Sequence, residues 1–108
     1  MINLSRNEIK TILTSFYLWK NTDFSHLDRK FQNKMRSGMK KVEDKLFKGF
    51  SELNDDDVEI IRHTLSEFAS FLNDPDAEFD PNASDEERSF YMDLIYSIAG
   101  KFSFSLEL

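Results

Sequence analysis

Three stretches of the chain carry the local signature of a helix start, and each is followed by apolar residues at helical spacing. In this signature, the capping box, a short polar residue accepts a hydrogen bond from the first turn, and an acidic residue three positions later reaches back to the backbone of the cap. It occurs at residues 5–8, 54–57 and 84–87. In the first two, an apolar residue before the cap is also placed to contact one in the first turn. Three such starts in a chain of 108 residues predict an all-α fold.

A fourth helical region is predicted between the first two boxes, from about Ser25 to Phe50, and the first helix should end near Lys20. In all four regions, apolar residues recur at intervals of three or four, which places them on one face of a helix. The predicted inner faces are Ile9, Ile12, Leu13 and Phe16; Leu27, Phe31, Met35, Met39, Val42, Leu46 and Phe50; Val58, Ile61, Leu65, Phe68 and Leu72; and Tyr91, Leu94, Ile95, Ile98 and Phe102.

Two glycines and the C-terminal tail complete the predicted architecture. Gly38 lies inside the region 25–50, where glycine costs about 1 kcal/mol relative to alanine, so this region is one helix or two. Gly100 is the predicted end of the last helix. The tail 101–108 alternates apolar and polar residues like a strand, and it either displaces part of the helical pattern, pairs with the N-terminal residues or extends along the bundle. We therefore predict one helical domain over residues 1–108, a bundle of four to five helices with an extended C-terminal tail.

The charges of the chain are separated along its length. Residues 1–28 are neutral overall, residues 29–48 carry eight basic against two acidic side chains, and residues 49–108 carry three basic against fifteen acidic ones. This separation gives a basic segment and an acidic second half within a net charge of −6. The molecule is therefore an electrical dipole along its sequence.

The composition also bears on the compartment. There is no cysteine, which fits a reducing environment. The longest uninterrupted apolar run, Phe16 to Trp19, is far shorter than the about 20 residues that cross a bilayer. The first ten residues lack the apolar core of a signal peptide. We therefore expect a cytoplasmic protein with no membrane partner.

The connection 72–88 holds both prolines and seven carboxylates. Counted from Asp74, the oxygen-ligand positions of a calcium-binding EF-hand loop fall on Asp74, Asp76, Glu78, Asn82 and Asp85. Three residues argue against calcium binding. Phe79 stands where the EF-hand loop needs glycine, Pro81 also lies within the loop, and the side chain of Asp85 is too short to act as the usual bidentate ligand. A calcium-binding helix pair remains an alternative to an acidic connection in which the prolines end helices.

The basic segment does not favour a nucleic-acid partner. Five lysines fall on one side of the predicted helix, namely Lys30, Lys34, Lys41, Lys45 and Lys48. No aromatic residue is interleaved with them to stack on bases, and phosphate would be repelled by the acidic remainder of the chain. A solvated face, partly neutralised by neighbouring acidic helices, accounts for the same lysines, and no nucleic acid is expected.

Signatures of catalysis and of cofactors are also weak. His63 lies four residues from both Glu59 and Glu67, but a zinc site needs three or four converging ligands and the chain has only two histidines. No glycine-rich phosphate loop or serine nucleophile motif is present in the sequence. We expect a protein that is not an enzyme and that uses no cofactor or metal.

Protein binding has the broadest support. Acidic residues gather at 55–59 and 74–87, where their field would attract a basic protein surface. Six large apolar side chains also fall off the predicted inner faces: Leu18, Phe47, Ile60, Phe71, Phe79 and Tyr96. Aromatic residues within an acidic surround resemble the composition of a binding hot spot, although extra core and solubilising charge account for them equally well.

Three segments of the chain resemble the small helical immunity proteins of bacterial toxin and immunity pairs, of the contact-dependent growth inhibition or colicin D immunity type. They are the aromatic first helix with its polar break (15–24), the segment 65–82 and the last helix (89–102). The resemblance implies an acidic helical bundle that binds a cognate toxin, often a nuclease, and blocks its active site. A His-Gln-Asp-Trp signature of some members is absent, and the corresponding region reads WKNTDF.

The leading prediction is therefore a stoichiometric inhibitor whose carboxylates fill the basic cleft of a toxin. The alternatives are the calcium-binding helix pair and a small regulatory or adaptor protein, for instance one encoded by a phage. The sequence makes no prediction of the oligomeric state. The predicted partner-binding residues are Asp55, Asp56, Asp57, Asp74, Asp76, Glu78, Phe79, Asp80, Asp85 and Glu86.

Overall fold

The computed structural model describes residues 3–22, 26–48, 53–74 and 85–106. Within these ranges it contains four helices and no strand, which confirms the all-α prediction. The helices are α1 (Arg6–Lys20), α2 (Arg29–Phe47), α3 (Asp55–Asn73) and α4 (Asp85–Phe102).

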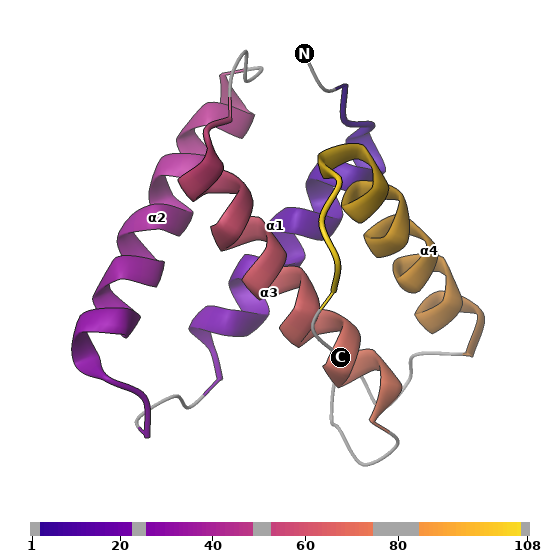
Figure 1. Ribbon diagram of the computed structural model, residues 1–108. Coiled ribbons are helices and arrows are strands. Elements are labelled where there is room, and N and C mark those ends of the chain that lie inside the picture. The colour runs from indigo at the N-terminus through magenta and orange to yellow at the C-terminus, as the bar shows by residue number, and fades with distance from the viewer. Residues whose placement is uncertain (1–2, 23–25, 49–52, 75–84, 107–108) are drawn as a thin grey trace.

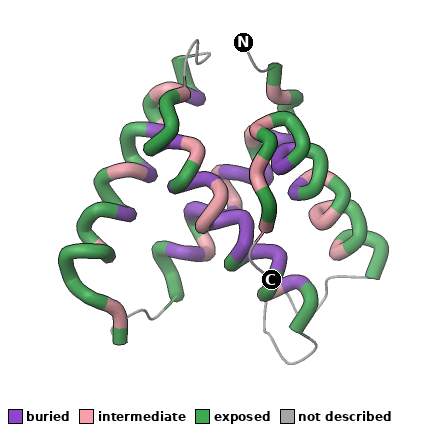
Figure 2. Tube along the Cα trace, in the orientation of Figure 1, coloured by how far each residue is buried: buried purple, intermediate pink, exposed green. Residues whose placement is uncertain are grey.

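The helices are arranged around a central pair. In Figure 1, α1 and α3 cross in the middle of the molecule, with α2 on one side and α4 on the other. Both α2 and α4 pack on α1 and α3, but in the described part of the chain they do not pack on each other. Buried residues gather where α1 and α3 cross, and the outer sides of α2 and α4 are exposed (Figure 2). The core is therefore shared by all four helices and centred on α1 and α3.

The two complete capping boxes form as predicted. The Glu8 amide donates to Ser5 Oγ at 3.1 Å, and the Ser5 amide donates to Glu8 Oε1 at 2.7 Å. At the start of α3, the Asp57 amide donates to Asn54 Oδ1 at 2.8 Å, and the Asn54 amide donates to Asp57 Oδ2 at 3.0 Å. The third box begins at Ser84, which lies outside the described residues. Local sequence therefore places the starts of α1 and α3 correctly.

Helix α2 is continuous through Gly38, so of the two alternatives for this region, one helix or two, the structure has one. The helix begins after Asp28, whose side chain accepts from the Lys30 amide at 2.9 Å, rather than at Ser25. A Cβ atom at position 38 would lie 2.7 Å from Ile60 Cδ1 on α3. Any larger residue at position 38 would therefore force the Ile60 side chain to move, so glycine allows the close approach of the two helices. The same contact buries Ile60, which the sequence placed off the inner face, to 6% exposure.

Helix α4 continues past Gly100, so the predicted end at this glycine is also wrong. The helix ends after Phe102, because Ser103 adopts a left-handed conformation with φ of 58°. The Phe104 amide then donates to Ala99 O at 3.0 Å, and the Ser103 amide donates to Gly100 O at 3.3 Å. This pair of bonds is the Schellman motif, which usually has glycine at the left-handed position.

The described part of the tail packs on the bundle without forming a strand. Figure 1 shows that the chain reverses after α4 and runs back in the opposite direction. The rings of Phe102 and Phe104 are stacked, with centroids 6.2 Å apart. Phe104 and Leu106 are half-buried against the core. Their alternation with polar residues thus reflects one side facing the bundle and the other facing solvent.

Most of the predicted inner-face residues are buried or half-buried. Phe31 is an exception, with 36% of its surface exposed at the edge of α2. Phe50 lies outside the described residues. The core also contains residues that were not assigned to an inner face, namely Trp19, Ile60, Ala69 and Ala99.

Two buried carboxylates connect the helix starts to the ends of other helices. Glu8, 2% exposed, accepts from Lys101 Nζ in the last turn of α4 at 2.5 Å and from Ser97 Oγ at 2.9 Å. Asp57, which is 5% exposed, forms a similar ion pair with Lys45 in the last turn of α2. In both cases the acidic residue of a capping box also forms an ion pair with a distant lysine, so each box fixes the relative position of two helices.

Candidate protein-binding surface

The end of α3 and the start of α4 lie side by side. Arg88, in the second turn of α4, donates from Nη1 to the carbonyl oxygen of Leu72 in the last turn of α3 at 3.1 Å. This bond satisfies one of the carbonyls that a helix end leaves without an intrahelical partner. It also brings Asp74, directly after α3, to the same end of the bundle as Asp85 and Glu86 (Figure 1). We refer to these three exposed residues as the acidic end.

Stabilisation of the helix ends explains only part of the negative charge at the acidic end. Asp85 and Glu86 occupy the first turn of α4, where the helix dipole favours negative charge. Asp74 is the C-cap of α3, where the dipole disfavours negative charge, and the last turn of α3 contains no basic residue. The helix dipole therefore accounts for the charge of Asp85 and Glu86 but not for that of Asp74.

Asp55 and Asp56 lie far from the acidic end. Both are exposed in the first turn of α3, so the length of this 19-residue helix, about 28 Å at 1.5 Å per residue, separates them from Asp74. Their charge is favourable at the helix N-terminus. Those of the predicted residues that the structure describes therefore do not form one continuous site.

Asp57 does not belong to an exposed binding surface, and its prediction as a partner contact is corrected. Its carboxylate is buried, caps α3 and forms an ion pair with Lys45. The capping role was predicted, but the ion pair was not, because Lys45 belongs to a different helix.

Four further predicted contacts, Asp76, Glu78, Phe79 and Asp80, lie outside the described residues. The same holds for most of the proposed calcium loop, of which only Asp74 and Asp85 are described. Among the described residues, no group of three or more His, Cys, Asp or Glu side chains is placed to hold a metal ion.

The large apolar residues off the inner faces have different environments. Ile60 is buried, and Leu18 and Phe71 are half-buried, so these three contribute to packing. Phe47 and Tyr96 are 76% and 54% exposed. Tyr17 and Phe90 are also exposed, although the sequence did not single them out.

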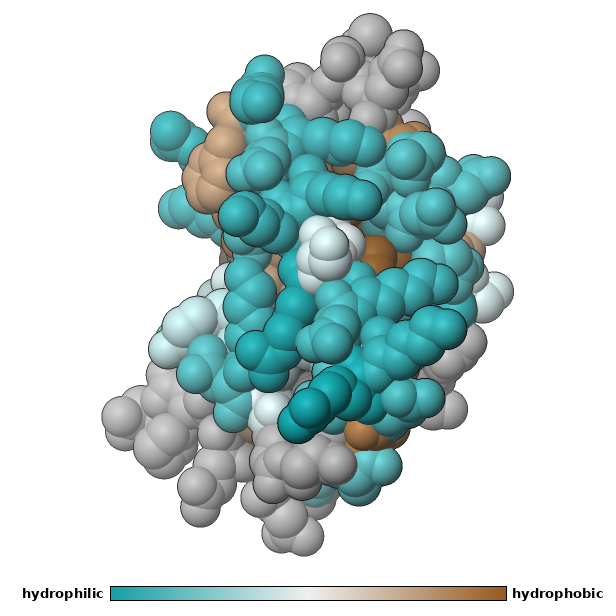
Figure 3. Space-filling view, turned by 90° about the vertical axis from the view of Figure 1, so that its left-hand side faces the viewer, coloured by the Kyte–Doolittle hydropathy of each residue, from teal (hydrophilic) through white to brown (hydrophobic). Residues whose placement is uncertain are grey.

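The basic face of α2 lies on the other side of the molecule from α4. Of the lysine stripe, Lys30, Lys34, Lys41 and Lys48 are exposed, and Lys45 is bonded to Asp57. Figure 3, which views the molecule from the α2 side, shows a largely hydrophilic surface. Because α2 and α4 are on opposite sides of the central pair, the basic residues of α2 are separated in space from the acidic residues of α4, whereas acidic residues of α3 lie beside α2 (Figure 1).

His63 contacts aromatic rings and, among the described residues, forms no ion pair with Glu59 or Glu67, the two residues four positions away from it. Its ring packs edge-on against Phe31 and Trp19, with centroid distances of 5.4 and 6.5 Å. Glu59 instead accepts from Arg62 Nη2 at 2.7 Å. This bond lowers the pKa of Glu59, against an opposing effect of burial, and the charges of Arg62, His63 and Lys34 lower it further. Glu59 therefore forms its ion pair with Arg62.

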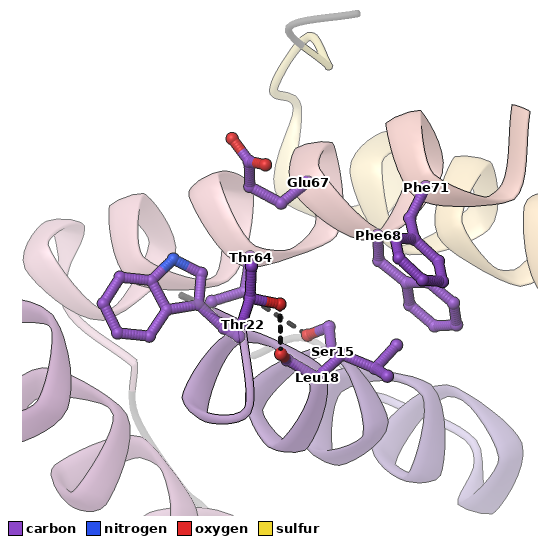
Figure 4. A pocket seen from close by; sticks show the side chains of 8 residues that line it. Ser15, Leu18, Thr22, Thr64, Glu67, Phe68 and Phe71 are labelled. Atoms are coloured by element: carbon purple, nitrogen blue, oxygen red, sulfur yellow. Dashed lines mark hydrogen bonds between the residues drawn. The ribbon is translucent and has the colours of Figure 1, made fainter. Parts of the chain in front are cut away.

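A cavity of about 60 Å³ lies between α1 and α3, and the sequence did not predict it. Its lining residues are Ser15, Leu18, Trp19, Thr22, Thr64, Glu67, Phe68 and Phe71. Figure 4 shows Ser15 and Leu18 approaching from α1, and Thr64, Phe68 and Phe71 from α3. The cavity depends on how these helices cross, which no local pattern of the sequence encodes.

Comparisons with known proteins give no relative for this chain. No protein-family model, no curated protein and no solved structure matches it. Of the helices in the described ranges, none combines the length and the apolar character that a bilayer-spanning helix requires.

Proposed function

We propose that this protein is a stoichiometric inhibitor that binds a basic protein through its acidic end, with the immunity protein of a bacterial toxin as the leading form. The observation that carries the proposal is the exposed cluster of Asp74, Asp85 and Glu86 on the side of the bundle away from α2. Within the described part of the chain, Asp85 and Glu86 make no ion pair. Their charge is therefore available to a partner.

The distance between the acidic end and the lysines of α2 strengthens the negative electrostatic field at the acidic end. At physiological ionic strength, charges are screened over about 8 Å, so lysines on the far side of the central helices neutralise the acidic end only weakly. A basic surface that approaches from this side meets a locally negative field. Such a field raises association rates and selects the orientation of the complex.

The acidic end is also held in place before binding. Asp85 and Glu86 are on a regular helix, and Arg88 ties that helix to the end of α3. A surface that is already ordered loses little conformational freedom on association. Carboxylates on such a surface could take the place of the phosphates that a nuclease binds in its cleft. Binding alone would then inhibit the nuclease, and the inhibitor would need no catalytic activity.

Complex formation with the product of the neighbouring gene tests the proposal. If that gene encodes a large secreted protein with a basic C-terminal domain, the isolated domain should form a one-to-one complex with this chain in size-exclusion chromatography. Co-expression should also protect cells from the toxicity of the domain. A domain that neither binds this chain nor loses toxicity in its presence would contradict the proposal.

A further inference from the structure

The cavity between α1 and α3 has a buried base and an exposed rim. Ser15, Trp19, Thr64 and Phe68 are each at most 3% exposed and form the base. Leu18 and Phe71 are half-buried, and Thr22 and Glu67 are exposed. The exposed residues Thr22 and Glu67 therefore mark the side on which the cavity reaches the surface.

We propose that this cavity receives a lysine or arginine side chain of the protein partner. The inference rests on the proposed function, because it specifies how a basic partner is recognised beside the acidic end. Three properties of the cavity support it: its size, the direction of its hydroxyl groups and the charge at its rim.

Size favours an unbranched chain. A single water needs about 10–15 Å³, and a dry cavity of about 150 Å³ holds a benzene ring. At about 60 Å³, this cavity is too small for an aromatic side chain and larger than a single water requires. A lysine or arginine side chain of a partner fits between these limits. It would enter with its charged end first, which places that end beside the hydroxyl groups of the base and leaves the methylene stem along the apolar side chains of the rim.

The hydroxyl groups of the cavity are turned so that they can accept hydrogen bonds. Ser15 Oγ donates to Ile12 O at 2.6 Å, and Thr22 Oγ1 donates to Leu18 O at 2.7 Å. Thr64 Oγ1 donates to Ile61 O at 3.1 Å and lies 3.0 Å from Ser15 Oγ. Because each hydroxyl has one proton, these bonds leave lone pairs for a ligand. Apart from the Trp19 indole, every polar side chain of the lining is thus an acceptor, and ammonium and guanidinium groups are donors only.

The rim adds charge complementarity. Glu67 is exposed, and among the described residues it makes no ion pair. Phe71, also at the rim, supplies aromatic surface on which the face of a guanidinium group stacks favourably. A carboxylate and an aromatic ring at one opening select a cation over a neutral side chain of the same shape.

The cavity is also continuous with the acidic end. Phe71 precedes Asp74 by three residues, and residues three apart are neighbours on the surface of a helix. A basic surface held at Asp74 would therefore have a side chain within reach of the cavity about one turn away. The two features form one binding region at the C-terminal half of α3.

The test uses the full chain with n-butylguanidinium as the probe, and it exploits the single tryptophan of the protein. Since Trp19 lines the cavity, its fluorescence should change saturably with the probe at millimolar concentrations. The neutral analogue N-butylurea has a nearly identical shape and should bind at least about tenfold more weakly. In amide-resolved NMR spectra, the probe should shift the signals of residues that line the cavity.

Variants at the rim complete the test. Glu67→Gln should weaken the probe about threefold, as expected for loss of a partly exposed ion pair, and Glu67→Lys should abolish binding. Asp93→Asn, an exposed substitution on α4 away from the cavity, should leave binding unchanged. Equal binding of both probes, no saturable response, or no effect of Glu67→Lys would each overturn the inference.

Failure of this inference and failure of the proposed function give different results. A chain that forms the predicted one-to-one complex but does not bind n-butylguanidinium retains the proposed function and loses the role of the cavity. A chain that binds n-butylguanidinium through Glu67 but does not bind or neutralise the basic domain loses the proposed function and retains a cation-binding cavity.

Discussion

Lys101 donates a hydrogen bond from the last turn of α4 to the buried carboxylate of Glu8 in the first turn of α1, 93 positions away in the sequence. The same lysine also donates to the carbonyl oxygen of Asn3 at 2.8 Å. Glu8 is at once the acidic residue of a capping box and one half of an ion pair. The start of the first helix and the end of the last are therefore held together by one carboxylate.

Removal of either partner should lower the free energy of unfolding. Glu8→Gln keeps an acceptor for the capping box but loses the ion pair, and it should cost about 1–3 kcal/mol. Lys101→Met leaves the buried carboxylate without its cation and should cost about 3 kcal/mol. Urea denaturation measures both, with Lys10→Met on the exposed side of α1 as the control. Wild-type stability in Lys101→Met would show that the pair contributes nothing.

The same carboxylate should make stability depend on pH. Burial by itself raises the pKa of Glu8, but hydrogen bonds from Lys101, the Ser5 amide and Ser97 outweigh it, so the pKa is lowered from its ordinary value of 4.5. A lowered folded-state pKa means that the contribution of Glu8 is complete above pH 4.5 and is lost as the pH falls through the lower folded-state value. The stability difference between wild type and Glu8→Gln should therefore shrink as urea titrations move from neutral pH to below 4.5. A difference that stays constant or grows would contradict this assignment.

The contact between Gly38 and Ile60 predicts a substitution whose effect changes sign. Gly38→Ala improves helix propensity by about 1 kcal/mol, but its Cβ would lie 2.7 and 2.8 Å from Ile60 Cδ1 and Cγ1. Overpacking of this kind costs about 1–3 kcal/mol, so the single variant should be destabilised. Ile60→Ala removes both atoms and leaves the Cβ of residue 60 at 4.0 Å. In a protein that already carries Ile60→Ala, Gly38→Ala should therefore be stabilising. If the effects of the two substitutions on stability are additive in a double-mutant cycle, the proposed steric clash between residues 38 and 60 is contradicted.

The end of α4 offers two stabilising substitutions. Ser103 holds a φ of 58°, which glycine adopts at little cost, so Ser103→Gly should raise stability by about 0.5–1 kcal/mol. Gly100 is inside the helix, and a Cβ there meets nothing within 4 Å. Gly100→Ala should therefore also raise stability, by about 0.5–1 kcal/mol. Thermal unfolding of the two single variants checks both values. A destabilised Ser103→Gly would mean that the serine side chain matters more than its backbone angle.

Features encoded by neighbouring residues were predictable, and features that depend on helix crossing were not. The boxes at Ser5 and Asn54 were found because their partners lie three residues away. Whether Gly38 divides α2 was left open, and the end of α4 was wrongly placed at Gly100, because the sequence does not distinguish a glycine at a close approach of helices from one at an ordinary helical position. No pattern within α2 shows that Ile60 will meet it.

The predicted binding residues show the same division. The acidic composition of the second half was visible in the sequence, but the length of α3 separates Asp55 from Asp74, and the pairing of Asp57 with Lys45 removes one residue from the surface. The cavity at Trp19 and Glu67 required the packing of α1 on α3. Which of these residues lie together on the surface therefore depends on helix packing, which composition alone does not encode.

The central proposal, that the acidic end binds a basic partner, is tested most directly by the association rate at low ionic strength with the basic domain that we expect the neighbouring gene to encode. Two charge-reversal variants are compared. Asp74→Lys with Glu86→Lys alters the acidic end, and Asp44→Lys with Asp93→Lys makes the same change of net charge at exposed positions elsewhere. The first variant should associate at least about tenfold more slowly than wild type, and this difference should shrink at high salt. The second should retain most of the wild-type rate, and equal rates for the two variants would contradict the claim.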